Sequence, residues 1–192
     1  MNKARLEAFS DGVLAIIITI MVLELKTPHD ISWEAIRQLI PVLASYVISF
    51  LIIGTYWANH HHLLHTVNTV TSNMIWANLN LLFWLSLIPF ATIWMGESNF
   101  VPTLVGVYAG LQCICGIAYY ILLRVIVASQ PGNKDLLVPL EKQSKRGWIS
   151  FLIYAAAIPA AFIHPAISVL FFVLVLVTWV IPDRNIEKAL KE

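Results

Sequence analysis

Residues 5–24 read RLEAFSDGVLAIIITIMVLE, and this stretch decides the fold class. No Asp, Glu, Lys or Arg occurs between Asp11 and Glu24. A helix of about 20 predominantly apolar residues crosses the hydrocarbon layer of a bilayer. Because acids precede the apolar run and Glu24 closes it, the stretch lacks the pattern of a cleaved signal peptide. We therefore predict a retained transmembrane helix over about residues 4–25.

The rest of the chain has the same character. Of its 192 residues, 59% are apolar and 12% are charged, whereas a soluble domain carries about a quarter charged residues. Long stretches without charge lie between Arg37 and Glu97, between Glu97 and Arg124, and between Arg146 and Asp183. We predict an all-α integral membrane protein, one six-helix transmembrane domain over residues 1–192 with no soluble domain. The expected spans are approximately 4–25, 36–58, 74–96, 103–127, 147–163 and 166–182.

Polar residues and prolines set the expected boundaries. The polar segment 59–73 is expected to join the second and third spans. Pro41 falls near an expected helix start, whereas Pro89 and Pro159 lie inside spans and predict kinks. The last two spans are short, so a re-entrant hairpin is the alternative there. Gly106 and Gly110 have the Gly-x-x-x-Gly spacing that lets two helices approach closely.

Basic residues predict the orientation. With six spans both termini lie on one side, while Lys26 and Arg37 fall on the other. The termini's side collects Lys3, Arg5, Lys134, Lys142, Lys145, Arg146, Arg184, Lys188 and Lys191. By the positive-inside rule the termini are cytoplasmic, in the plasma or inner membrane of the cell. The net charge of +1 gives no basic footprint for nucleic acid.

The first span has two different faces. At about 100° per residue, Gly12, Ile16, Ile20 and Leu23 fall within about 40° of one line, with Thr19 on the flank. Asp11 lies nearly opposite, and an ionisable residue in a membrane segment is costly unless it is paired or functional. We expect Asp11 to face neighbouring helices that neutralise it. From periodicity alone, the apolar stripe could equally face lipid or the core.

Several motifs resemble a known family. The pattern Arg5-x-x-x-Phe9-Ser10-Asp11 resembles the signature of the transmembrane protein 175 family, the endolysosomal potassium channels and their smaller prokaryotic homologues. Residues 56–61, Tyr-Trp-Ala-Asn-His-His, are similar to the end of that family's second span, and residues 78–90 to its third. The later spans resemble the family only as apolar helices.

The resemblance implies a potassium-permeable cation channel without a Thr-Val-Gly-Tyr-Gly filter. In that family, four six-helix repeats surround one pore lined by the first helices, with isoleucine or leucine at its narrowest part. At the matching positions, Ile16 would form the constriction, Ile20 and Leu23 further apolar layers, and Thr19 a flanking polar group. One repeat cannot enclose a pore, so a homotetramer is implied. The partners would be other copies of the chain, the lipid bilayer and monovalent cations; the permeant ion is potassium, with no cofactor.

Four histidines invite a metal hypothesis, because His61 and His65 are one helical turn apart. No acid accompanies them in the pattern of a zinc protease, and no cysteine lies nearby. We therefore expect no metal site. Instead, one or two histidines should join Trp57 and Asn78 in hydrogen bonding the Ser10–Asp11 end of the first helix. The predicted signature network comprises Arg5, Phe9, Ser10, Asp11, Trp57, His60, His61 and Asn78.

Catalytic patterns are absent from the sequence. There is no Ser-His-Asp spacing and no phosphate-binding glycine loop, so we do not expect an enzyme. The rival hypothesis is a proton- or cation-coupled secondary transporter that uses Asp11 as a ligand. No inverted repeat, the usual mark of such transporters, is visible.

Overall fold

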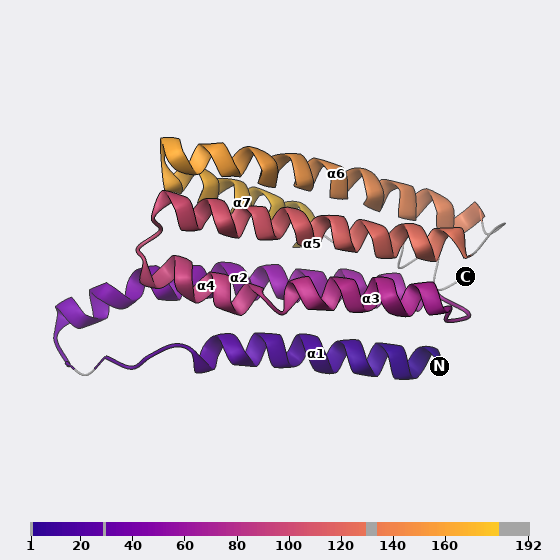
Figure 1. Ribbon diagram of the computed structural model, residues 1–192, viewed down its shortest axis with the longest axis horizontal. Helices are drawn as coiled ribbons and strands as arrows, with labels where there is room; N and C mark the ends of the chain where they lie inside the picture. The colour runs from indigo at the N-terminus through magenta and orange to yellow at the C-terminus, as the bar shows by residue number, and fades with distance from the viewer. Residues whose placement is uncertain (1, 29, 130–133, 181–192) are drawn as a thin grey trace.

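The computed structural model describes residues 2–28, 30–129 and 134–180, which form helices and no strands (Figure 1). The helices are α1 (Lys3–Leu23), α2 (Trp33–His65), α3 (Ser72–Leu85), α4 (Ile88–Glu97), α5 (Pro102–Ala128), α6 (Lys134–Ile163) and α7 (Pro165–Val180). The all-α class expected from the sequence is confirmed.

Five segments are long enough and apolar enough to cross a membrane. They are Lys3–Leu23, Trp33–His65, Ser72–Glu97, Pro102–Ala128 and Leu140–Ile163. The remaining helix, α7, is apolar but has only 16 residues, which gives a length of about 24 Å at 1.5 Å per residue. Residues 181 and 182, the expected end of the sixth span, lie outside the described residues.

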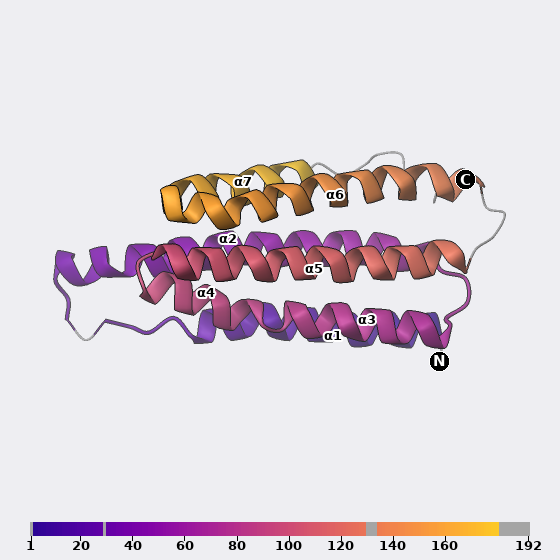
Figure 2. The ribbon, with the colours of Figure 1, turned by 45° about the horizontal axis from the view of Figure 1, so that its top comes forward.

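The helices run up and down in three layers (Figure 2). The α6–α7 hairpin forms one outer layer, α2 and α5 form the middle, and α1 lies with α3 and α4 on the other side. Helix α1 packs on α2, α3 and α4. It therefore occupies an edge of the subunit, far from α6 and α7. Helix α7 stops part-way along α6 (Figure 1).

Two helices extend beyond the expected spans, and the expected helix start near Pro41 was wrong. Helix α2 continues through the polar segment to His65, because residues 59–65 contain no proline or glycine and His60, Leu63 and Leu64 are buried. The same helix starts at Trp33, so Pro41 lies inside it. Helix α6 begins at Lys134, well before the expected start at residue 147. Apolar length sets only the membrane-crossing part, and a helix can extend into water beyond it.

The third span is broken where the sequence predicted a kink. Helix α3 ends at Leu85, and α4 begins at Ile88 with Pro89 in its first turn. Proline has no N–H and its ring collides with the carbonyl four residues earlier, so a helix cannot pass through unchanged. The Thr92 hydroxyl hydrogen bonds the Ile88 carbonyl at 2.7 Å. This contact is the usual bond of a threonine hydroxyl to the carbonyl four residues earlier in its own helix.

A chain of hydroxyl groups joins the layers behind this break. Ser49 Oγ of α2 lies 2.7 Å from Tyr108 Oη of α5 and 2.7 Å from Thr92 Oγ1 of α4. All three side chains are fully buried. In a bilayer such groups have no water to bond, so the contacts fix the three helices relative to one another.

Among the glycines of the described residues, Gly96 lies closest to another helix, not the predicted pair Gly106 and Gly110. A Cβ at Gly96 would collide with Ser45 Oγ and lie 2.8 Å from the Val42 Cα. At Gly106 a Cβ would make only ordinary contacts with α6, and at Gly110 it would meet nothing within 4 Å. Glycine therefore serves close packing between α4 and α2, which the sequence spacing did not reveal.

We predict that Gly96→Ala lowers stability by about 1–3 kcal/mol, because the added methyl group overpacks the α2–α4 contact. Thermal unfolding in detergent measures the effect. The matched control is Gly54→Ala, where a Cβ meets nothing within 4 Å. Equal stability of the two variants would contradict the close approach.

Candidate functional site

The apolar stripe of α1 is the face that the subunit leaves uncovered. Ile16, Ile20 and Leu23 are 57%, 41% and 80% exposed. The buried residues of α1 lie on another face and are Leu6, Ser10, Leu14, Ile17 and Met21. Thr19 is also exposed, and its hydroxyl donates to the Ile16 carbonyl at 2.9 Å. The stripe is thus free to contact other copies or a pore, with the polar oxygen of Thr19 beside it.

A groove of about 550 Å³ runs between α1 and α4. Ile16 and Ile20 border it from α1, and Phe90 and Ile93 from α4. Glu24 and Glu97, at the ends of the same two helices, also line it. The groove is therefore apolar along its length and acidic at the end away from the N-terminus.

An ion pair holds that acidic end together. Lys26 Nζ donates to Glu97 Oε1 at 2.7 Å, connecting the segment after α1 to the end of α4. The hydrogen bond and charge of Glu97 raise the pKa of Lys26 above its usual value. Both side chains are exposed, so salt screens their attraction.

A buried hydrogen-bond chain anchors the other half of α1. His60 Nε2 lies 2.6 Å from Asn78 Oδ1, Asn78 Nδ2 donates to Ser10 Oγ at 2.9 Å, and Ser10 Oγ donates to the Leu6 carbonyl at 2.8 Å. Because the Asn78 amide nitrogen donates to Ser10, its oxygen is the acceptor for His60. The proton therefore sits on His60 Nε2, and the chain has one direction from α2 through α3 to α1.

Asp11 is held separately by α2. Trp57 Nε1 donates to Asp11 Oδ1 at 3.0 Å. The ring of His61 stacks on Trp57, with centroids 6.2 Å apart. Asp11 therefore faces α2, as its position opposite the stripe indicated.

Arg5 and Phe9 do not join this network inside the subunit. Both are exposed, Phe9 to 50%, and the Arg5 guanidinium makes no hydrogen bond or ion pair within the described residues. They share the uncovered side of α1 with Ile16. The structure thus brings together Ser10, Asp11, Trp57, His60, His61 and Asn78.

The contacts of Lys3 with His65 and Glu7 were not predicted from the sequence. Lys3 Nζ donates to the His65 carbonyl at 2.7 Å and lies 3.9 Å from Glu7 Oε1. A cation at the C-terminal end of α2 is favourable, because unpaired carbonyls gather there. The Lys3–Glu7 spacing was the available signal. The described residues contain no group of three or more His, Cys, Asp or Glu that could hold a metal ion.

Comparison with known proteins identifies the family. The family described as the endosomal/lysosomal potassium channel TMEM175 matches residues 5–89, which contain α1, α2, α3 and the start of α4. A potassium channel of Chryseobacterium sp. (strain P1-3) is 48% identical over 192 residues, covering 100% of both chains. The chain belongs to the TMEM175 family. It is thereby placed in a family of potassium channels, not of enzymes.

More distant relatives match in structure or in sequence. The crystal structure of a lysosomal potassium-selective channel TMEM175 homolog from Chamaesiphon minutus matches with a TM-score of 0.83 and 26% identity, over 95% of this chain and 97% of that one. The human endosomal/lysosomal proton channel TMEM175 is 28% identical over 177 residues, which are 88% of this chain and 34% of the human protein.

We predict that Asn78→Leu lowers stability by about 1–3 kcal/mol, because the buried His60 N–H loses its acceptor. The double variant with His60→Leu should cost less than the sum of the two single changes, since the pair acts as one unit. Thermal unfolding of the four proteins gives the coupling. Asn80→Leu is the control, because Asn80 lies on the same helix and is only partly buried. If the effects of the two single changes simply add, His60 and Asn78 are not coupled, and the hydrogen bond between them does not contribute to stability.

Proposed function

We propose that this protein is a potassium-permeable cation channel in which four copies surround a central pore lined by α1. The single observation that carries the proposal is the uncovered apolar stripe of α1. In the TMEM175 family, to which the chain belongs, the first helices line the pore. Ile16 would form the constriction, with Ile20 and Leu23 as further layers and Thr19 beside them. The structural homolog from Chamaesiphon minutus, titled a potassium-selective channel, supports the choice of ion.

An aliphatic constriction determines how such a pore would work. Isoleucine side chains offer no oxygen to replace the hydration shell of an ion, and a narrow apolar ring can close by expelling water. Conduction therefore requires the ring to widen until a largely hydrated ion passes. Selectivity for potassium over sodium should be modest, because Thr19 supplies the nearest side-chain oxygen.

Membership of a family in which four repeats surround one pore supports the homotetramer. A single helix face cannot enclose a pore, and closed cyclic assemblies are the common solution for identical subunits. The groove between α1 and α4 is bordered by Ile16 and Ile20, so a neighbouring copy that fills it would contact the edge of the stripe. Arg5 and Phe9, uncovered in the subunit, would then face the pore entrance or the neighbour.

Charge distribution supports cytoplasmic termini in a plasma or inner membrane. The end of the bundle that holds the start of α1 also holds the end of α5 and the start of α6 (Figure 1). Those segments carry Lys3, Arg5, Arg124, Lys142, Lys145 and Arg146. Arg184, Lys188 and Lys191 lie outside the described residues. At the opposite end, Glu24, Asp30 and Glu34 would raise the local cation concentration.

Ion flux tests the proposal directly. Purified protein in potassium-loaded liposomes should release potassium down its gradient, and planar bilayers should give single-channel currents with a potassium-dependent reversal potential. A secondary transporter would instead couple flux to a second ion at fixed stoichiometry. The bond from Trp57 to Asp11 favours the channel, since Asp11 has a protein partner. Proton flux belongs in the same assay, because the human relative is named a proton channel.

We predict that Ile16→Asn raises ionic current and lowers the preference for potassium, because amide groups at the constriction ease wetting. Ile20→Asn and Leu23→Asn should have smaller effects. The matched control is Val22→Asn: Val22 is 46% exposed on the same helix but lies off the stripe. Wild-type conductance and selectivity in an assembled Ile16→Asn protein would remove α1 from the pore.

A further inference from the structure

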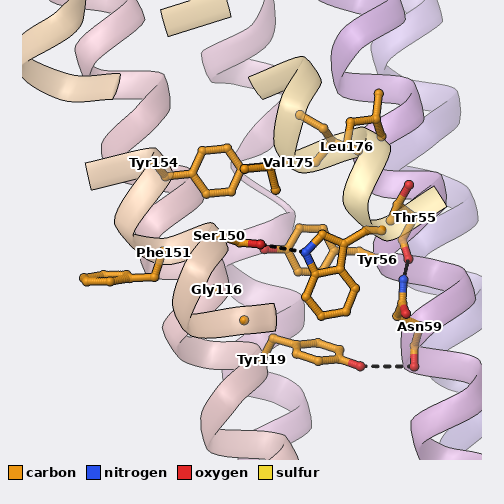
Figure 3. Close-up of a pocket in the computed structure, with 13 residues that line it drawn as sticks. Thr55, Tyr56, Asn59, Gly116, Tyr119, Ser150, Phe151, Tyr154, Val175 and Leu176 are labelled. Carbon is orange, nitrogen blue, oxygen red and sulfur yellow. Dashed lines mark hydrogen bonds between the residues drawn. The ribbon is translucent and has the colours of Figure 1, made fainter. Parts of the chain in front are cut away.

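A small cavity, partly open at the surface of the subunit, lies among α2, α5, α6 and α7 (Figure 3). Its volume is about 50 Å³. No residue of α1 lines it, so it is separate from the proposed pore. Tyr119 borders it on one side, where its hydroxyl donates to the Asn59 carbonyl at 3.2 Å.

The size of the cavity limits what can occupy it. An engineered cavity that binds benzene measures about 150 Å³, and one water needs about 10–15 Å³ of probe-occupied space. A volume of about 50 Å³ is therefore too small for an aromatic ring or an acyl chain. It suits a few water molecules.

Two tyrosine hydroxyls at the cavity lack a protein partner. Tyr56 and Tyr154 both line it, and Tyr154 is only 4% exposed. Within the described residues, neither hydroxyl makes a hydrogen bond. Tyr56 is partly exposed, unlike Tyr154. A hydroxyl group without a protein partner is stable only where water can reach it, because the lipid around the bundle offers no hydrogen bond. The orphaned hydroxyls thus call for a ligand that both donates and accepts hydrogen bonds.

Neighbouring polar groups can extend such a cluster. Ser150 Oγ accepts from Trp179 Nε1 at 2.7 Å and donates to the Arg146 carbonyl at 3.0 Å. Gln143 Nε2 donates to Tyr119 Oη at 2.7 Å, while Gln143 Oε1 is buried without a partner. Each oxygen retains a lone pair. A bound water typically makes about three hydrogen bonds. Tyr56, Ser150 and Tyr154, which all line the cavity, can provide them.

Two glycines keep the space open. Gly116 of α5 and Gly147 of α6 line the cavity, and a Cβ at either position would meet no atom within 4 Å. Larger side chains would fill the volume that the hydroxyls face. The empty space and the orphaned hydroxyls therefore occur at the same place.

We propose that this cavity binds a small cluster of ordered water molecules, hydrogen bonded to the Tyr56 and Tyr154 hydroxyls. The water links α6 to the middle layer of the bundle, where direct contacts leave polar groups unpaired. The site belongs to each subunit and does not depend on assembly or conduction.

Tyr154→Phe tests the proposal through the sign of its effect. If water binds the hydroxyl, removing the hydroxyl loses a hydrogen bond. The Tm of a chain of this size should then fall by about 2–4 °C. If the cavity is dry, removal of an orphaned hydroxyl raises Tm or leaves it unchanged, which overturns the proposal. Tyr108→Phe is the calibration, because the Tyr108 hydroxyl bonds Ser49 directly.

Filling the cavity provides the second arm. Gly116→Ala places a methyl group in the space proposed for water. The control Gly110→Ala adds a methyl group to the same helix outside the cavity. At both positions the added Cβ meets no atom within 4 Å. The proposal expects Gly116→Ala to be less stable than Gly110→Ala. A more stable Gly116→Ala protein indicates a dry void and overturns it.

Radiolytic hydroxyl-radical footprinting detects the water itself, because radicals formed from bound water modify adjacent side chains. Tyr154 should be modified in the wild-type protein more than Tyr108, which is fully buried away from the cavity lining. The modification at Tyr154 should fall in Gly116→Ala and persist in Gly110→Ala. Equal, low modification of both tyrosines, or a co-purified lipid that Gly116→Ala displaces, would overturn the assignment.

Discussion

Hydrocarbon offers no hydrogen-bond partners, and this constraint organises the molecule. A polar side chain turned inward is stabilised by a partner on another helix or on its own backbone. Two such sets join the layers: the hydroxyls of Ser49, Thr92 and Tyr108, and the chain from His60 through Asn78 to Ser10. Apolar packing alone would leave the helices free to rotate, because dispersion contacts have little direction.

The second set determines which face of α1 is uncovered. Ser10 points inward to Asn78, and Ile17, seven residues later, falls on the same face and is buried. Ile16 is then turned by about 100° from Ile17 and leaves the packed face. The Trp57–Asp11 bond opposes rotation in the other sense. The orientation of the proposed pore-lining stripe is thus a consequence of polar contacts about two turns away.

Much of this was readable from the sequence, because charge-free length and the positions of acids are strong signals in membrane proteins. The all-α class, the break at Pro89 and the partners of Ser10 and Asp11 were predicted. The end of α2 and the start of α6 were not predicted, because hydropathy does not indicate how far a helix continues outside the lipid. Gly96 was missed because close approach depends on which helices meet, and the Gly106–Gly110 spacing carried no such information. The cavity is formed where four helices, α2, α5, α6 and α7, meet, and no single-helix pattern contains that information.

The distribution of directional contacts along α1 bears on how the proposed constriction can widen. The helix is fixed at Ser10 and Asp11 near one end, and the segment after it is tied by Lys26 to Glu97 at the other. Between them, no side-chain hydrogen bond in the described structure joins residues 12–23 to another helix; Thr19 bonds only the carbonyl of Ile16. Displacement of Ile16 therefore breaks no directional contact and meets only the resistance of apolar packing, including the bordering groove. With α1 anchored by polar contacts at its ends and held by apolar packing between them, dilation of the proposed aliphatic ring would break no hydrogen bond between helices.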